Sequence, residues 1–155
     1  MAVLATACAP KDDATIIGKQ SPEIKNGLMT PEVLWSFGRV AGVQVSPDGS
    51  KILYSVSYYS IPENKGNSEL FVMNADGSDK QQITKTATRE ASAQWMKDGK
   101  HIAFLSSETG TMQLWIMDAD GSDRKQITER EGGVNDFAFS PDETKLLFVA
   151  DVKYG

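Results

Sequence analysis

Few residues in this chain could serve as a nucleophile or a base. His101 is the only histidine, and Cys8 is the only cysteine. A serine or cysteine nucleophile needs a neighbouring base and an acidic group that orients the base. His101 opens the segment HIAFL, at a position that lysine occupies in two related segments, as Lys51 and Lys145. We therefore interpret His101 as a residue at the solvent-facing end of a strand and not as a catalytic base.

The serines also lack the setting of a hydrolase nucleophile. The sequence contains no G-x-S-x-G motif, which would place a serine on a sharp turn between a strand and a helix. The serines that follow glycine, namely Ser50, Ser78 and Ser122, fall in predicted hairpin turns. No C-x-x-C, H-E-x-x-H or phosphate-binding glycine loop is present. We predict no catalytic residue and no cofactor within this chain.

Two acidic stretches, NADGSDKQQIT at 74–84 and DADGSDRKQIT at 118–128, raise the possibility of calcium sites. An EF-hand loop that began at Asp118 would need glycine at its sixth position, where Asp123 stands. In the first copy Lys85 stands at the twelfth position, which requires a bidentate glutamate. We therefore interpret both stretches as hairpin turns and predict no metal site.

Trp95 and Trp115 are the two tryptophans that could stack on a sugar ring if they were exposed. Both lie inside apolar runs, AQWM and QLWIM. We predict that they pack in the core.

The composition fits one soluble globular domain. The chain has 155 residues, 40% of them apolar, with 16 basic and 21 acidic residues and a net charge of −5. This length is sufficient for a sizeable core. No basic cluster with interleaved aromatic residues offers a track for phosphates, so nucleic acid is not an expected partner. No apolar run is long enough for a membrane-spanning helix.

The N-terminal sequence MAVLATACAPKDD resembles the end of a bacterial lipoprotein signal, in which the lipid-attached cysteine follows small residues. Ala5, Thr6 and Ala7 precede Cys8, although leucine is more usual where Ala5 stands. The segment lacks a basic start, so the alternatives are a true start codon upstream or a plain flexible N-terminus. We predict an exported protein, periplasmic or anchored to the outer membrane through Cys8, with no other membrane attachment.

Residues 1–29 are predicted to be this signal-like segment and a linker, because glycine and proline interrupt them without a sustained period. The segment TPEVLWSFG at 30–38 predicts a short helix. Thr30 can cap it, Pro31 suits its first position and Gly38 can end it. The residues available for burial are Val33, Leu34 and Phe37.

Residues 39–155 consist of short apolar runs separated by turn residues, which predicts β-strands. The runs are VQVS, KILYSVS, ELFVMN, QQIT, AQWM, HIAFLS, QLWIMD, KQIT, FAFS and KLLFVA. Several are apolar at both odd and even positions, so both faces of each sheet must be covered.

The strands repeat at a fixed interval. Asn74 and Asp118 lie 44 positions apart, and so do Asp98 and Asp142. The interval between Asp48 and Asp98 is 50, and we place the extra residues in one loop, SYYSIPENKGNSE. A four-strand unit of about 40 to 45 residues is typical of a propeller blade.

The turns within each repeat use the chemistry of tight hairpins. In PDG, proline presets φ, aspartate bonds its own backbone and glycine takes the left-handed conformation. Glu143 replaces this glycine in the third repeat, at a cost of about 1 kcal/mol if the conformation is kept.

We therefore predict an all-β fold, an incomplete β-propeller of about two and a half four-stranded blades after a short helix and a flexible N-terminal segment. The blades are placed at about 40–87, 88–130 and 131–155. Propellers close with four to eight blades, so we expect the natural protein to continue.

The repeats resemble those of bacterial prolyl oligopeptidase-family serine peptidases and of the Tol-system periplasmic propeller protein, both with WD-like repeats. The matching segments include SPDGSKILYSVS, ELFVMNADGSDKQQIT, WMKDGKHIAFLS, QLWIMDADGSDRKQIT and FSPDETKLLFVA, between Val43 and about Ala150. The lead-in TPEVLWSFGRVAGVQVSPDG is similar to that of dipeptidyl aminopeptidases and acylaminoacyl-peptidases.

The peptidase resemblance implies a propeller that gates an α/β-hydrolase domain carrying a Ser, Asp and His triad, with short peptides as substrates. The missing blades and that hydrolase domain would be the partners of this chain. We expect the N-terminal propeller part of an exported serine peptidase. The alternatives are a non-enzymatic binding or scaffold propeller of the Tol-system type and, because fold does not imply function, any other binding module.

Overall fold

The computed structural model describes residues 16–152, which excludes Cys8. This part of the chain contains one short helix, α1 (Pro31–Ser36), followed by strands. The strands are β1 (Arg39–Val45), β2 (Lys51–Ser60), β3 (Lys65–Asn74), β4 (Gln81–Gln82), β5 (Glu90–Trp95), β6 (His101–Ser106), β7 (Gln113–Asp118), β8 (Lys125–Gln126), β9 (Asp136–Phe139) and β10 (Leu146–Val149). Between residues 16 and 152, no helix has the length and apolar character needed to cross a membrane.

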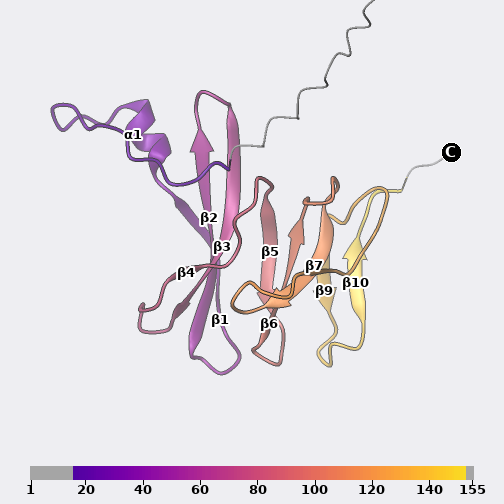
Figure 1. Cartoon of the computed structure of the whole chain (residues 1–155). Helices are drawn as coiled ribbons and strands as arrows, with labels where there is room; N and C mark the ends of the chain where they lie inside the picture. The colour runs from indigo at the N-terminus through magenta and orange to yellow at the C-terminus, as the bar shows by residue number, and fades with distance from the viewer. Residues whose placement is uncertain (1–15, 153–155) are drawn as a thin grey trace, which may run out of the picture.

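The strands form three antiparallel sheets that stand side by side (Figure 1). The first sheet has the order β1-β2-β3-β4, the second β5-β6-β7-β8, and the third contains β9 and β10. The register shifts between Ala41 and Gln44 in the first sheet and between Ala91 and Gln94 in the second. The same irregularity at the same place in both sheets marks them as copies of one unit. The predicted all-β, incomplete propeller of four-stranded blades is confirmed, and the sheets do not close into a ring.

The core lies between the sheets. One cluster joins the first two blades and consists of Leu53, Leu70, Val72, Ile83, Ile102, Phe104, Trp115 and Met117. A second cluster joins the second and third blades and is built on Ala103, Leu105, Leu114, Val134 and Phe137. On the outer faces of the first and last sheets some apolar residues are exposed, such as Val43 on β1 and Leu147 on β10. The second blade is therefore sandwiched on both faces, as its continuous apolar strands require.

Helix α1 begins as the sequence predicts, because Thr30 caps it by accepting a hydrogen bond from the Val33 backbone N–H. It ends at Ser36 and not at Gly38, since Phe37 already has an extended backbone. Of the three residues available for burial, Val33 is buried, whereas Leu34 and Phe37 are exposed. A helix of under two turns can turn only one narrow face toward β2.

Gly38 has a packing role instead of ending the helix. A Cβ atom at this position would lie 2.6 Å from Cγ1 of Val56 and 2.9 Å from Cε1 of Tyr58. Both neighbours belong to β2. The glycine therefore lets the segment after α1 run directly against the first blade.

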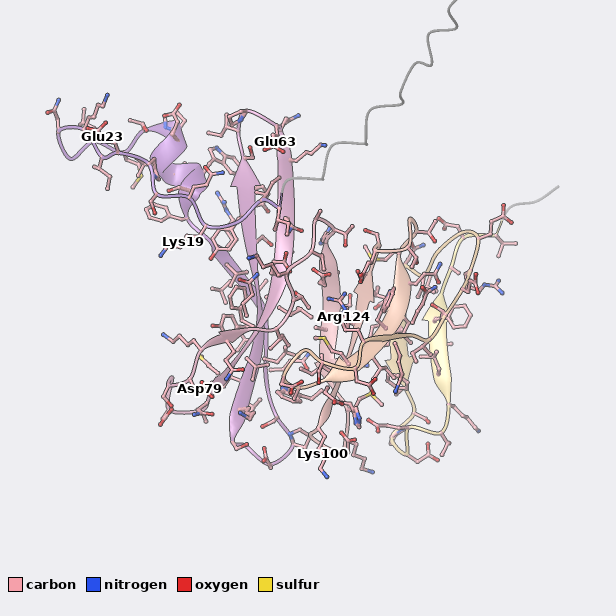
Figure 2. The ribbon with its side chains drawn as sticks, in the orientation of Figure 1. Lys19, Glu23, Glu63, Asp79, Lys100 and Arg124 are labelled. Atoms are coloured by element: carbon pink, nitrogen blue, oxygen red, sulfur yellow. The ribbon has the colours of Figure 1, made fainter. Side chains whose placement is uncertain are left out.

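The extra residues of the first repeat form a longer hairpin and not the predicted loop. Strand β2 pairs with β3 up to Ser60 and Lys65, with Tyr59 opposite Gly66. Tyr58 and Tyr59 favour strand structure, and Asn64 adopts the positive φ of 48° that the turn needs. Glu63 lies at the tip of this hairpin, whereas Asp79 and Lys100 mark the opposite end of the blades (Figure 2).

Candidate functional site

The repeated ADGSD stretches are closed hairpin turns. Asp76 Oδ1 accepts hydrogen bonds from the Ser78 backbone N–H at 2.9 Å and from Ser78 Oγ at 2.6 Å. Asp120 and Ser122 repeat both bonds at the same distances. The serine donors lower the pKa of both aspartates, although partial desolvation opposes the shift. These carboxylates thus accept hydrogen bonds from within their own turns.

The flanking elements also differ from those of an EF-hand. Strands β3 and β4 flank the first turn, and β7 and β8 flank the second, where an EF-hand has helices. Among residues 16–152, no cluster of three or more His, Cys, Asp or Glu side chains could hold a metal ion.

The turns between the first two strands of the first and third blades have the same internal bonding. Ser46 Oγ donates to Asp48 Oδ1 at 2.6 Å, and Ser140 Oγ donates to Asp142 Oδ1 at 2.6 Å. These bonds, with those from the residues that follow, lower the pKa of Asp48 and of Asp142 to about 2. Glu143 keeps a positive φ of 55° where the other copies have glycine, as the turn pattern predicts.

His101 is the first residue of β6 and lies between two carboxylates. Its Nδ1 is 2.5 Å from Asp98 Oδ2, and its Nε2 is 3.3 Å from Asp118 Oδ1. Its side chain is 44% exposed. Lys51 occupies the equivalent place in the first blade and donates to Asn74 Oδ1 at 3.5 Å. His101 thus does what lysine does there, which is to join the ends of two adjacent strands.

Trp95 and Trp115 lie in the contact between the first two blades, as expected. Trp115 is buried within the first core cluster, and Trp95 packs against that cluster. The indole Nε1 of each is buried and has no hydrogen-bond partner. Neither ring is available as a platform for a sugar.

Each complete blade contains a polar network that the sequence analysis did not single out. It joins the third strand of the blade to the segment after the fourth. Glu69, which is 1% exposed, accepts hydrogen bonds from Asn67 Nδ2 at 2.8 Å, the Thr86 backbone N–H at 2.9 Å and Thr84 Oγ1 at 2.7 Å. The Thr84 hydroxyl also accepts a bond from the Leu70 backbone N–H. The network therefore ties β3 to the segment that leads into the second blade.

The second blade contains the same network with an amide in place of the acid. Gln113 Oε1 accepts from Thr128 Oγ1 at 2.8 Å and from the Arg130 backbone N–H at 3.1 Å. Thr128 Oγ1 accepts from the Leu114 backbone N–H. Gln113 follows Glu69 by the repeat interval of 44 residues. That interval is the signal that could have identified the pair from the sequence.

Glu90 is a second buried acid in the contact between the first two blades. Its side chain is fully buried, and Arg124 Nη2 lies 3.6 Å from Oε1. Arg124 lies closer to Glu108, at 2.8 Å, and its guanidinium faces the rings of Phe104 and Trp115. Figure 2 shows Arg124 beside the second sheet. Burial, reinforced by Glu69, raises the pKa of Glu90 to about 7.

An aromatic and cationic cluster joins α1 to the first blade. The guanidinium of Arg39 lies 4.4 Å from the Trp35 ring centroid and 4.8 Å from that of Tyr59. The two rings meet edge to face at 5.2 Å. Trp35 and Tyr59 also line a hollow beside the β2–β3 hairpin with Ser60, Ile61, Asn64, Lys65 and Gly66. The cluster positions the helix on the blade.

Taken together, the stacked four-stranded antiparallel sheets, the repeated turns and the repeated polar network define a β-propeller domain. The sequence profile of the TolB beta propeller domain family matches residues 32–154. The chain belongs to this family.

The chain is also similar to curated peptidases. It is 48% identical over 147 residues to Dipeptidyl-peptidase 5 of Porphyromonas gingivalis, a match that covers 92% of this chain and 22% of the relative. The chain thus spans about a fifth of the length of the curated relatives it matches.

Solved propellers have the same fold. The acylaminoacyl peptidase of Pyrococcus horikoshii is 18% identical, with a TM-score of 0.61 over 76% of this chain and 18% of that one. A protein assigned as TolB from Agrobacterium tumefaciens is 30% identical, with a TM-score of 0.57 over 69% of this chain and 36% of that one.

Proposed function

We propose that this chain is the N-terminal propeller part of an exported serine peptidase that hydrolyses short peptides. The observation that carries this proposal is the 48% identity to Dipeptidyl-peptidase 5 across 92% of the chain. The match occupies 22% of that relative, which leaves ample length for a hydrolase domain in a protein of the same organisation. Bond cleavage would take place in that domain, on a Ser, Asp and His triad outside these residues.

The propeller would act by restricting access. Its blades are held together by apolar clusters and buried polar networks, so it is suited to form a rigid wall over a catalytic domain. A wall of this kind admits short, flexible peptides and keeps folded proteins away from the catalytic groups. Export to the periplasm and lipid attachment at Cys8 belong to the same proposal, and they rest on the resemblance of MAVLATAC to a lipoprotein signal.

The test uses the product of the whole gene with fluorogenic dipeptidyl and single-residue amide substrates. We expect release of the fluorophore from dipeptidyl amides and its loss after treatment with a fluorophosphonate, which modifies active serines. A blocked N-terminus on the same dipeptide serves as the matched control. Absence of cleavage of every dipeptidyl amide would contradict the proposal.

The second candidate function is a non-enzymatic binding propeller of the Tol-system type. The family profile and the 30% identity to the Agrobacterium protein favour it. The identity is lower than that to the peptidase and extends over less of the chain. A whole gene product that binds an envelope protein and does not react with fluorophosphonate would support this second candidate.

A further inference from the structure

We propose that Glu69 and Glu90 form a buried acid pair in which Glu69 carries the charge and Glu90 holds a proton, so that the packing of the first blade on the second depends on pH. Both residues are 1% exposed. Glu69 comes from β3 of the first blade, and Glu90 opens β5 of the second. This inference does not depend on the peptidase proposal.

The hydrogen bonds around Glu69 suit a carboxylate. Three donors point at its two oxygens, from Asn67, Thr84 and Thr86. Buried carboxylates are stable when donors of this kind replace water. Gln113 has an equivalent place in the next blade, where its Oε1 accepts two of the same bonds. The position is thus built to present an acceptor oxygen to donors.

The hydrogen bonds around Glu90 suit a protonated acid. Its Oε2 is buried and has no partner, and its Oε1 lies 2.9 Å from Thr86 Oγ1. The Thr86 hydroxyl has a single hydrogen, and the Thr88 carbonyl oxygen lies 2.8 Å away as a competing acceptor. A proton on Glu90 can be donated to Thr86 Oγ1, which then donates to Thr88. This arrangement satisfies Glu90 Oε1 and both threonines in turn. An ionised Glu90 would compete with Thr88 for the Thr86 hydrogen, and its other donor, Ser106 Oγ, lies at the longer distance of 3.4 Å from Oε1.

Two charged groups, Glu69 and Arg124, face Glu90. Glu69 and Glu90 are joined through Thr86, whose backbone N–H donates to Glu69 while its hydroxyl contacts Glu90. Arg124, which precedes β8, lies 3.6 Å from Glu90 and 2.8 Å from the half-exposed Glu108. The arginine is therefore shared, and its closer partner is the acid at the surface. Burial and the Glu69 charge accordingly outweigh Arg124 and raise the pKa of Glu90 to about 7.

The next contact between blades has no such pair. The residues 44 positions further on are Gln113 and Val134, and Val134 is fully buried. The polar network at Gln113 is preserved. The contact between the second and third blades thus supplies an internal comparison in which the same backbone arrangement forms without the two acids.

The sign of the pH effect follows from the direction of the shift. A glutamate that takes up its proton more readily in the folded state stabilises the fold below its unfolded pKa, which is about 4.5. That contribution is lost as the pH rises from about 4.5 toward the folded value of about 7. Above this range an ionised Glu90 repels Glu69, and the first blade packs less tightly on the second.

The test compares thermal unfolding of the full chain with its Glu90→Gln variant between pH 5 and pH 8. Glutamine keeps the shape and the donor but cannot ionise. We expect the Tm of Glu90→Gln minus that of the unmodified chain to rise by about 5 °C across this range. Glu129→Gln, at an exposed glutamate of the second blade, is the control and should give a constant difference. A constant difference for Glu90→Gln as well would overturn the proposal.

A second measurement does not rely on the variant being folded. The ¹³C signal of the Glu90 side-chain carboxyl in the unmodified chain should titrate within about one pH unit of neutrality. A midpoint near the ordinary value of 4.5 would contradict the proposal, whatever the behaviour of Glu90→Gln.

Discussion

Glu143 Oε1 accepts a hydrogen bond from the backbone N–H of Lys97 at 2.7 Å, so that the turn of the third blade is tied to the corresponding turn of the second. A second bond joins the same two turns, since Lys97 Nζ donates to the Pro141 carbonyl oxygen at 3.1 Å. Glu143 holds a positive φ of 55°, which is unfavourable for a residue with a side chain. The bond between blades offsets that cost.

We predict that Glu143→Gly does not stabilise the protein. Glycine would relieve about 1 kcal/mol of backbone strain but would remove a carboxylate bond of similar worth. Urea unfolding should therefore place the variant within about 0.5 kcal/mol of the unmodified chain. A gain of about 1 kcal/mol would show that the Lys97 contact contributes nothing.

Much of the architecture could be predicted from the sequence because the turn residues recur at a regular spacing. The 44-residue spacing, with aspartates that bond their own turns, was sufficient to predict two complete blades and the first two strands of a third. The sequence could not reveal why Glu143 departs from glycine, since its partner Lys97 lies 46 positions away and on another blade.

The buried acids were missed for a related reason. Glu69 lies within β3 and Glu90 opens β5. Charged residues are usually solvated, but both of these side chains are buried in the stacked blades. Leu34 and Phe37 were candidates for burial and are exposed, because apolar character alone does not say what covers a side chain. The prediction that this chain carries no catalytic residue stays a prediction. So does lipid attachment at Cys8, which lies outside the described residues.

Gly121 and Gly77 provide a matched test of how closely the blades approach. Both have positive φ, of 89° and 84°. A Cβ at Gly121 would lie 2.3 Å from the Ile83 carbonyl oxygen of the first blade, whereas a Cβ at Gly77 meets nothing within 4 Å. Gly77→Ala should cost about 1 kcal/mol from backbone strain alone, and Gly121→Ala about 2 kcal/mol more because a backbone must move. Equal losses in thermal unfolding would argue against this close approach.

Thr84 and Thr128 test the polar network in its acidic and neutral forms. Each hydroxyl accepts a bond from a backbone N–H of the third strand of its own blade and donates to Glu69 or Gln113. Thr84→Val should cost about 3 kcal/mol, because it removes one donor from a buried carboxylate, and Thr128→Val about 1.5 kcal/mol, because its acceptor is an uncharged amide. Denaturant unfolding of the two variants measures the difference. If Thr128→Val lost more stability than Thr84→Val, the charge would not lie on Glu69.

Arg39 anchors α1 through its stacking on Trp35 and Tyr59. Replacement by alanine should destabilise the protein by about 1 to 2 kcal/mol, and replacement by lysine by less, because lysine keeps the charge but not the planar stacking group. Thermal unfolding gives the stability of both variants. If Arg39→Ala and Arg39→Lys were equally stable, the cation would not be what holds the helix.

The central proposal is that this chain is the propeller part of a serine peptidase whose catalytic residues lie elsewhere in the protein. The most direct measurement is fluorophosphonate labelling of the whole gene product, followed by mass spectrometric mapping of the modified serine. We predict one labelled serine, in a G-x-S-x-G setting and outside the sequence described above. A label on a serine of this chain, or no labelling of an intact and folded gene product, would contradict the account.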